Sequence, residues 1–94
     1  MWVNNIKKFE SVLDLEENKI YRYCSTGITK DIIIHDCYFK VLEIKNDDTC
    51  MVHVIKNCIK GSGILLGVNE WHLNGLLRYV SGPYDYNEVL AKIL

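Results

Sequence analysis

Hydrophobic residues near the start of the chain recur with the spacing of an α-helix. Four of them are separated by four, three and four residues and so fall on one stripe: Trp2, Ile6, Phe9 and Leu13. Charged residues between them, such as Lys7 and Glu10, fall on the other side. The spacing predicts a helix over residues 3–15, followed by a break at Asn18.

Further along, short runs of β-branched and aromatic residues are separated by glycine, asparagine, aspartate and serine, which is typical of antiparallel strands. The runs predict five strands, over residues 20–24, 38–45, 49–56, 64–68 and 76–80. Between the second and third stand Asn46, Asp47 and Asp48, whose short side chains hydrogen-bond local backbone and favour a tight turn. We therefore expect these two strands to form a β-hairpin.

The segments between the other strands predict three connections of different kinds. Residues 25–37 are expected to form a long loop that folds back on the strands, with the isoleucine triplet 32–34 as an apolar plug. The Lys-Gly-Ser-Gly sequence at residues 60–63 predicts a flexible connection. Residues 69–75 predict a tight turn that buries Trp71.

Alternation within the strands predicts which side chains form the core. In the strand over residues 49–56, even and odd positions point to opposite sides, and neither set is clearly polar. Both faces of the sheet are therefore expected to be covered. The predicted core residues are Phe39, Val41, Val52, Val54, Leu66, Trp71 and Val80.

The end of the chain predicts a second helix, over residues 85–94. Asp85 precedes Glu88 by three residues, which is the capping-box pattern of a helix start. This helix carries more apolar side chains than one core-facing stripe accommodates. Part of it is therefore expected to contact a second copy of the chain or another protein, unless it wraps around the sheet and hides both flanks. The predicted contact residues are Tyr84, Tyr86, Leu90, Ile93 and Leu94.

The composition is that of one globular domain over residues 1–94, with 49% hydrophobic and 24% charged residues. The net charge of -1 and the pI of about 6.3 disfavour nucleic-acid binding, since phosphate neutralisation requires a basic face. No apolar run is long enough to span a membrane, and the first residues lack the pattern of a signal peptide. We therefore expect a cytoplasmic protein with reduced cysteines and no membrane partner.

Cysteine and histidine pairs are the residues that come nearest to catalytic or metal chemistry. His35 with Cys37 would face one side of a strand, but Cys50 and His53 are three residues apart and would face opposite sides. Neither pair matches the close Cys-x-x-Cys spacing of structural zinc sites, and no cysteine stands at a helix start, where a thiolate nucleophile would be stabilised. The Gly-Ser-Gly sequence at 61–63 lacks the lysine of a phosphate loop. We expect no catalytic residues, no metal and no cofactor.

The order of these elements predicts an α+β fold: a small five-stranded antiparallel barrel over about residues 20–80, flanked by N- and C-terminal helices. The same span resembles the small SH3-like β-barrel proteins that are common in bacteriophage and mobile-element genomes. The resemblance is carried by Ile20-Tyr21-Arg22-Tyr23, Gly27, Tyr38-Phe39-Lys40-Val41-Leu42-Glu43-Ile44, Asp47-Asp48, Trp71-His72-Leu73 and Tyr79-Val80.

The resemblance implies an SH3-like barrel and favours a non-catalytic protein-binding module. We expect a phage or mobile-element inhibitor that occupies a surface of a larger host defence protein, as anti-CRISPR proteins do. One alternative is a nucleic-acid-binding barrel, in which Tyr21 and Tyr23 stack on bases. Another is a small-molecule binder or divergent enzyme, which would need a concave pocket. The basic residues of the nucleic-acid alternative are Lys40, Lys45, Lys56, Lys60 and Arg78.

Overall fold

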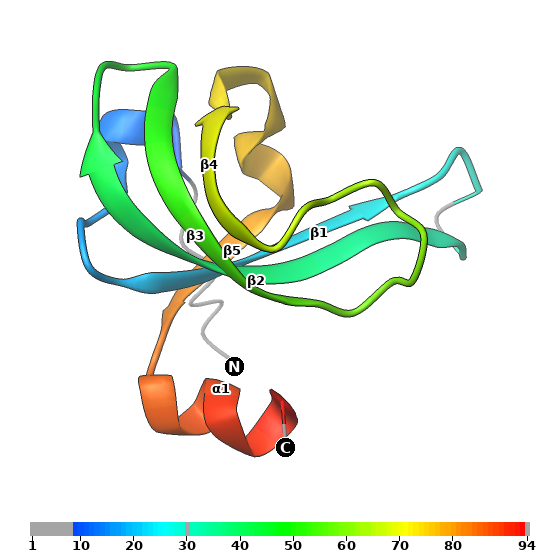
Figure 1. Cartoon of the computed structure of the whole chain (residues 1–94). Coiled ribbons are helices and arrows are strands. Elements are labelled where there is room, and N and C mark those ends of the chain that lie inside the picture. Colours follow the sequence, from blue (N-terminus) through cyan, green and yellow to red (C-terminus); the bar gives the residue numbers. More distant parts are fainter. Residues whose placement is uncertain (1–8, 30, 94) are drawn as a thin grey trace, which may run out of the picture.

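The structure, a computed structural model of the chain, describes residues 9–29 and 31–93 (Figure 1). These residues form five strands, two short 3-10 helices and one α-helix. In chain order the elements are η1 (Val12–Asp14), β1 (Ile20–Thr26), β2 (Ile33–Ile44), β3 (Thr49–Asn57), β4 (Gly67–His72), η2 (Asn74–Tyr79), β5 (Val80–Tyr84) and α1 (Tyr86–Ile93).

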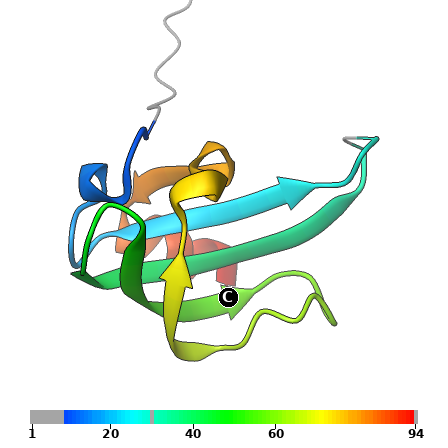
Figure 2. The same ribbon diagram turned by 90° about the horizontal axis from the view of Figure 1, so that it is seen from above.

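The five strands form one antiparallel sheet in the order β4-β3-β2-β1-β5. Figures 1 and 2 show that the sheet is strongly curved, with η1 and η2 on one side and α1 on the other. Within the described residues β4 and β5 do not pair with each other, and η2 connects them. The predicted five-stranded antiparallel sheet is thus confirmed, but it is open, and its helices are short.

The predicted hairpin is formed by β2 and β3. The side-chain oxygen of Asn46 accepts hydrogen bonds from the backbone N–H groups of Asp48 (2.9 Å) and Thr49 (2.8 Å), which fixes the turn. Strand alternation then places the predicted core residues of both strands on the concave face of the sheet. The four that are buried there are Phe39, Val41, Val52 and Val54.

Aromatic rings occupy the centre of the core on the concave face. Tyr21 has no exposed surface, and its ring centroid lies 6.0 Å from that of Phe39 and 5.7 Å from that of Phe9. The Tyr21 hydroxyl accepts a hydrogen bond from the Glu16 N–H (2.9 Å), so its polar tip is satisfied inside the core. Val12 of η1 is also fully buried, which attaches the N-terminal turn to the sheet.

A smaller hydrophobic cluster lies between the sheet and α1. Val89 is 1% exposed and packs with Ile20 and Tyr38, so the C-terminal helix covers part of the convex face. The side-chain oxygen of Asp85 accepts the Asn87 N–H (2.8 Å), and this bond satisfies a donor at the start of the predicted helix. Among the described residues, no helix has the length and apolar composition that crossing a membrane requires.

The predicted N-terminal helix is wrong where the structure describes its span, and residues 3–8 lie outside the described part. Only the single turn η1 follows Ser11, whose hydroxyl accepts the Leu13 N–H (3.0 Å) while the Asp14 carboxylate accepts the Ser11 N–H (3.1 Å). This reciprocal cap starts the turn, and the extended backbone of Leu15 ends it directly after Asp14. Phe9 is buried, but Leu13 is 62% exposed and does not share its stripe.

The loop predicted over residues 25–37 is also wrong, because the segment lengthens β1 and β2. Ser25 pairs with His35, and the Gly27 N–H donates to the Ile32 carbonyl oxygen (2.8 Å) near the tip. β-Branched isoleucines favour this extended backbone. The triplet 32–34 is between 44% and 62% exposed, so it does not plug the core.

The fourth strand begins later than predicted. β4 starts at Gly67, so Leu66, predicted in the core, is 64% exposed. Most of the predicted turn over residues 69–75 belongs to this strand, and Trp71 is half-buried beside the core. The strand forms here because it pairs with β3 from Val54 opposite Gly67 onward.

The fifth strand also begins later in the chain than predicted. Residues 76–79 belong to η2, and β5 begins at Val80, which is buried as predicted. Pro83 is tolerated in β5 because this strand lies at the edge of the sheet. Gly82 has φ 125°, and a Cβ there would lie 3.1 Å from the Ile20 carbonyl oxygen, so a glycine is needed where β5 approaches β1.

Candidate protein-binding groove

Large exposed hydrophobic side chains gather at one end of the molecule, which we call the apolar end. Some lie at the tip of the β1–β2 hairpin, and the others lie in or just after the connection from β3 to β4. Figure 1 shows that the hairpin and this connection extend from the same end of the sheet. Such concentrations of exposed apolar surface mark interaction sites. The residues are Ile28, Ile32, Ile33, Ile34, Leu65, Leu66 and Val68.

An open groove of about 500 Å³ lies next to the apolar end, and we call it the β4 groove. One wall is β4 with the connection before it. The other is made by residues of β1, β2 and η2. Its volume falls within the range of about 300–1,000 Å³ that is typical of binding sites. The main lining residues are Tyr23, His35, Ile64, Leu65, Trp71 and Leu76.

Aromatic rings that pack on the core form the floor of this groove. The ring centroid of Trp71 lies 5.0 Å from that of Phe39 and 6.2 Å from that of Tyr23. Tyr23 in turn lies 6.2 Å from His35 and 6.0 Å from Tyr79. Burial raises the pKa of Tyr23 above its usual 10.0, so the floor stays uncharged there. Rigid aromatic surface of this kind loses little entropy when a partner binds.

His35, a lining residue of the groove, contains an unsatisfied polar atom. Its Nδ1 is buried, and among the residues that the structure describes it has no hydrogen-bond partner. A buried donor or acceptor without a partner costs about 1–3 kcal/mol.

A polar cluster ties β4 to the β2–β3 turn. The His72 Nδ1 lies 3.1 Å from the Asp48 carboxylate and 3.1 Å from the Thr49 hydroxyl. The same carboxylate accepts the Asn74 backbone N–H (3.3 Å), and the Leu73 N–H donates to the Asp48 carbonyl oxygen (2.8 Å). The cluster therefore holds the end of β4 and the start of η2 in place, beside the groove.

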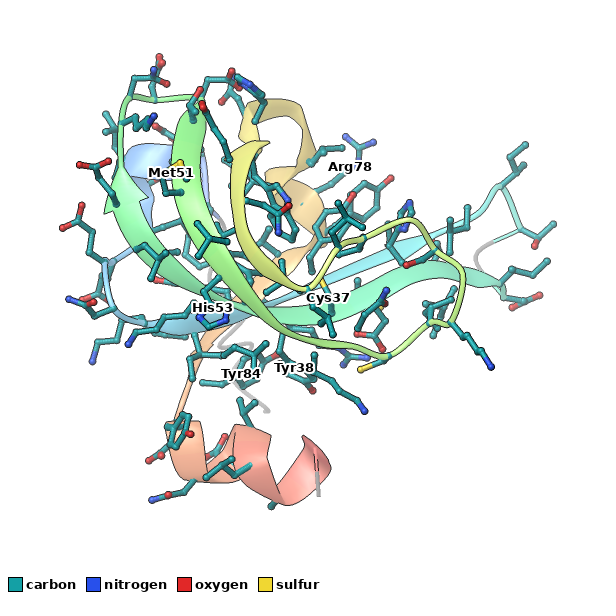
Figure 3. The ribbon with its side chains drawn as sticks, viewed as in Figure 1. Cys37, Tyr38, Met51, His53, Arg78 and Tyr84 are labelled. Carbon is teal, nitrogen blue, oxygen red and sulfur yellow. The ribbon has the colours of Figure 1, made fainter. Side chains whose placement is uncertain are left out.

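Those predicted C-terminal contact residues whose side chains the structure describes do not line this groove: Tyr84 lies on the side of the sheet that faces α1 (Figure 3), and Tyr86 and Leu90 belong to α1. Tyr84 is half-buried, and its hydroxyl lies 2.7 Å from that of Ser81. Tyr86 is 58% exposed and Leu90 is half-buried. The Ile93 side chain and all of Leu94 are outside the described part.

The cysteine and histidine pairs do not assemble into a reactive site. Cys37 and Cys50 are buried, and His53 is exposed on the α1 side of the sheet (Figure 3). Burial raises the pKa of Cys37 to about 12 and that of Cys50 to about 11, opposite to the shift that activates a thiolate. Across the described ranges, no three histidine, cysteine or acidic residues are grouped to hold a metal ion.

The two residues proposed for base stacking do not form an open aromatic face together. Tyr21 is fully buried and Tyr23 is 9% exposed. Two of the accompanying basic residues have other contacts: Lys45 lies 3.7 Å from the Glu70 carboxylate, and the Arg78 guanidinium lies 4.6 Å from the centroid of the Tyr79 ring. These positions do not support the nucleic-acid alternative.

Comparisons with protein-family models, with curated proteins and with solved structures found no match to this chain. The β4 groove was missed by sequence reasoning because Leu66 is expected in the core of a strand and Trp71 is expected to be buried by a tight turn. One signal was available, namely two adjacent leucines, Leu65 and Leu66, in a connection that also holds several glycines. Leucines in such a flexible connection are more exposed than leucines in a strand.

Proposed function

We propose that this protein is a non-catalytic protein-binding module whose contact surface comprises the β4 groove and the apolar end. The observation that carries the proposal is the exposed isoleucine and leucine surface beside an aromatic floor. Ile28 is fully exposed at the hairpin tip, and Leu65 is 70% exposed at the groove wall. Complete burial of such a side chain against a partner is worth about 1.5–3 kcal/mol, so a few of them suffice for specific binding.

We also propose that the open, curved sheet is a small barrel of the SH3-like class. Support comes from five consecutive antiparallel strands, with the last two joined by the tight turn η2. The tyrosine strand and the central hairpin, which carry the sequence resemblance, are β1 and the β2–β3 pair. This class presents its loops and grooves to other molecules on a rigid strand scaffold.

In its narrower form, the proposal is that the module belongs to a phage or mobile element. It binds a larger host defence protein in the cytoplasm and blocks it stoichiometrically, as anti-CRISPR proteins do. The small size of the chain and the sequence resemblance support this form. Blocking by occupancy needs contact area rather than chemistry, and the apolar end supplies that area.

Site-specific crosslinking tests the contact surface. A photoreactive amino acid replaces Leu65 in the groove wall in one variant and Leu13 in the other. Leu13 is a matched control because it is 62% exposed and lies in η1, beside the β2–β3 turn at the opposite end of the sheet (Figure 1). We expect the Leu65 variant to crosslink a discrete host protein that the Leu13 variant does not. Equal crosslinking from both positions would contradict the proposed surface.

Protection of an infecting phage tests the narrower form. The wild-type protein should restore plaque formation on a host that carries the matching defence system. A variant with Ile33→Lys and Leu65→Lys should lose this protection, since both charges fall on the contact surface. Leu13→Lys should retain it. Full protection by the double variant would place the inhibitory surface elsewhere.

A further inference from the structure

We infer that the β4 groove binds an extended segment of the partner protein, which adds to the sheet as a sixth strand beside β4. The segment carries apolar side chains at alternate positions. This inference rests on the proposed protein-binding function and specifies how the partner is held. It follows from the backbone of β4, the contrast between the two sheet edges, and the walls of the groove.

The free backbone groups of β4 can be assigned from the strand register. The Leu73 N–H donates to the Asp48 carbonyl oxygen, one step beyond the pair of His72 with Thr49. Hydrogen-bonded pairs alternate in an antiparallel ladder, so every second residue of β4 from this point bonds to β3. The residues between them direct their N–H and C=O groups away from β3: Val68, Glu70 and His72. Within the described part of the chain, β4 has a strand neighbour on one side only.

The two edges of the sheet differ in how they are protected against an added strand. β5 contains Pro83, has Gly82 at φ 125°, and shifts register against β1, and all three features discourage further pairing. β4 has no proline and no lysine, which are the usual protecting residues. Its pairing with β3 runs without a shift from Gly67 to His72. The β4 edge is therefore competent to pair, whereas the β5 edge is blocked.

The groove provides space and contacts for the side chains of an added strand. Alternate residues of a strand beside β4 would face the aromatic floor at Trp71 and Tyr23, while Leu65 and Leu76 flank them. His35 of β2 lines the groove together with Tyr23. Backbone pairing with β4 would thus give affinity, and the apolar floor would select the side chains.

The walls favour a single extended chain over a second copy of this protein. Residues of β1, β2 and η2 stand opposite β4, so the space beside its edge is a groove rather than an open flank on which another sheet could continue. A two-fold pairing of β4 centred on Glu70 would also place this carboxylate directly against its copy, which is destabilising. No lysine or arginine lines the described groove, so its chemistry suits an uncharged peptide rather than a nucleic acid.

A matched pair of variants tests the strand-addition mode. Glu70→Pro removes an outward N–H and places a ring at the edge, but it leaves the bonds to β3 in place. Glu70→Ala keeps that N–H and removes only the side chain, with its exposed contact to Lys45. The probe is a displayed library of random 12-residue peptides selected on the wild-type protein. We expect the selected peptides to alternate apolar residues, to bind Glu70→Pro at least about tenfold more weakly, and to bind Glu70→Ala within about twofold of wild type.

Amide hydrogen exchange of the wild-type protein provides an independent readout that does not depend on how well Glu70→Pro folds. In the free protein, the amides of Val68, Glu70 and His72 should exchange quickly, while those of Asn69 and Trp71 should be protected by β3. When the protein is saturated with a selected peptide, the amides of Val68, Glu70 and His72 should become protected. Unchanged exchange at these amides would overturn the inference.

The remaining outcomes separate this inference from the proposed function. Suppose that the Leu65 variant crosslinks a host protein that then binds the Glu70→Pro and Glu70→Ala variants with equal affinity. In that case the proposed function stands and strand addition is wrong. Enrichment of no peptide, or of peptides with helical or proline-rich patterns, overturns the extended segment. A wild-type dimer that Glu70→Pro alone dissociates would show that the edge pairs with a second copy instead.

Discussion

At the scale of single residues, Arg22 and Asp36 form the shortest ion pair among the described residues. The Arg22 Nε and a terminal nitrogen contact the two carboxylate oxygens at 2.8 Å and 2.7 Å. The Asp36 side chain is 11% exposed, and the hydrogen bonds that its carboxylate accepts raise the pKa of Arg22 above its usual value. The pair joins β1 to β2 on the side of the sheet that faces away from the core.

Replacement of Arg22 by methionine should destabilise the protein by about 2–4 kcal/mol, since it leaves a nearly buried carboxylate without its partner. Urea unfolding at neutral pH measures the loss. The double variant Arg22→Met with Asp36→Leu should recover much of it, because both charges are then absent. If Arg22→Met unfolds at the wild-type urea concentration, the pair contributes nothing to stability.

The buried thiols and phenols predict a loss of stability at alkaline pH. Burial raises the pKa of Cys37 from 9.0 to about 12, and it also raises those of Tyr21 and Tyr23 above 10.0. A group with a raised pKa in the folded state gives its full stabilisation below the unfolded pKa and loses it as pH rises toward the folded one. The contribution of these groups to the free energy of unfolding should therefore be constant below pH 9 and fall between pH 9 and about 12.

Cys37→Ala is the control for this pH dependence. The variant should be less stable at neutral pH because it opens a small cavity, but its free energy of unfolding should fall less steeply above pH 9. Chemical denaturation at a series of pH values measures both effects. Identical slopes for the two proteins would show that the Cys37 thiol does not titrate with unfolding.

At the scale of elements, Val89 is the main attachment of α1 to the sheet among the helix side chains that the structure describes. Val89 is 1% exposed and packs with Ile20 and Tyr38, whereas the neighbouring Leu90 is half-buried and Tyr86 is exposed. Among the described side chains, the helix is therefore attached to the sheet at Val89 and open to solvent at Tyr86. The predicted contact residues on α1 can be changed without changing this attachment point.

Val89→Asp should destabilise the protein by more than about 3 kcal/mol, because it places a charge in the cluster between α1 and the sheet. Leu90→Asp should cost less than about 1.5 kcal/mol, since the side chain reaches solvent. Thermal and urea unfolding compare the two. If Leu90→Asp also abolishes partner binding while the protein stays folded, the C-terminal segment belongs to the contact surface. Equal destabilisation by both variants would mean that Val89 and Leu90 both belong to the core.

At the scale of the whole molecule, the pairing of β1 with β5 links residues about 60 positions apart in the chain. Tyr23 opposes Val80, and both side chains belong to the main core. The order of the sheet thus depends on the last strand in sequence. Long-range pairing of this kind makes the domain cooperative from end to end.

A chain that ends after Tyr79 should lack a cooperative unfolding transition, because it loses β5, the buried Val80 and α1. A chain that ends after Tyr84 should keep the transition at a lower midpoint, since only α1 is removed. Circular dichroism during heating distinguishes them. A cooperative transition in the shorter chain would show that β1 to β4 form the folding unit.

Metal removal is expected to leave the whole molecule unchanged. The described residues include no group of three potential ligands, and the buried cysteines are enclosed by apolar neighbours. Dialysis against EDTA should therefore leave the thermal midpoint within experimental scatter, and elemental analysis should find no stoichiometric zinc. One zinc per chain, or a lower midpoint after EDTA, would contradict this.

The sequence by itself determined the features that depend on neighbours within a few residues. The β2–β3 hairpin follows from Asn46, whose side chain bonds the backbone two and three positions on, and α1 follows from the cap at Asp85. Strand alternation alone identifies Phe39 and Val52 as core residues, without knowledge of which strands pair. Turn chemistry, caps and alternation act locally, so a single chain segment carries the information.

Only the tertiary structure decided which apolar residues are enclosed and which are exposed. Leu66, expected in the core, is exposed, and Trp71, expected in a turn, is half-buried in β4. The reason is that pairing with β3 sets the start of β4, and no local pattern specifies that register. Ile33 and Ile34 extend β2 because Thr26 pairs with Ile33 and Ser25 pairs with His35. The β4 groove exists because a curved, open sheet brings β4 opposite β1 and η2. Exposure and concavity depend on residues far apart in the chain, so they appear only once the fold is formed.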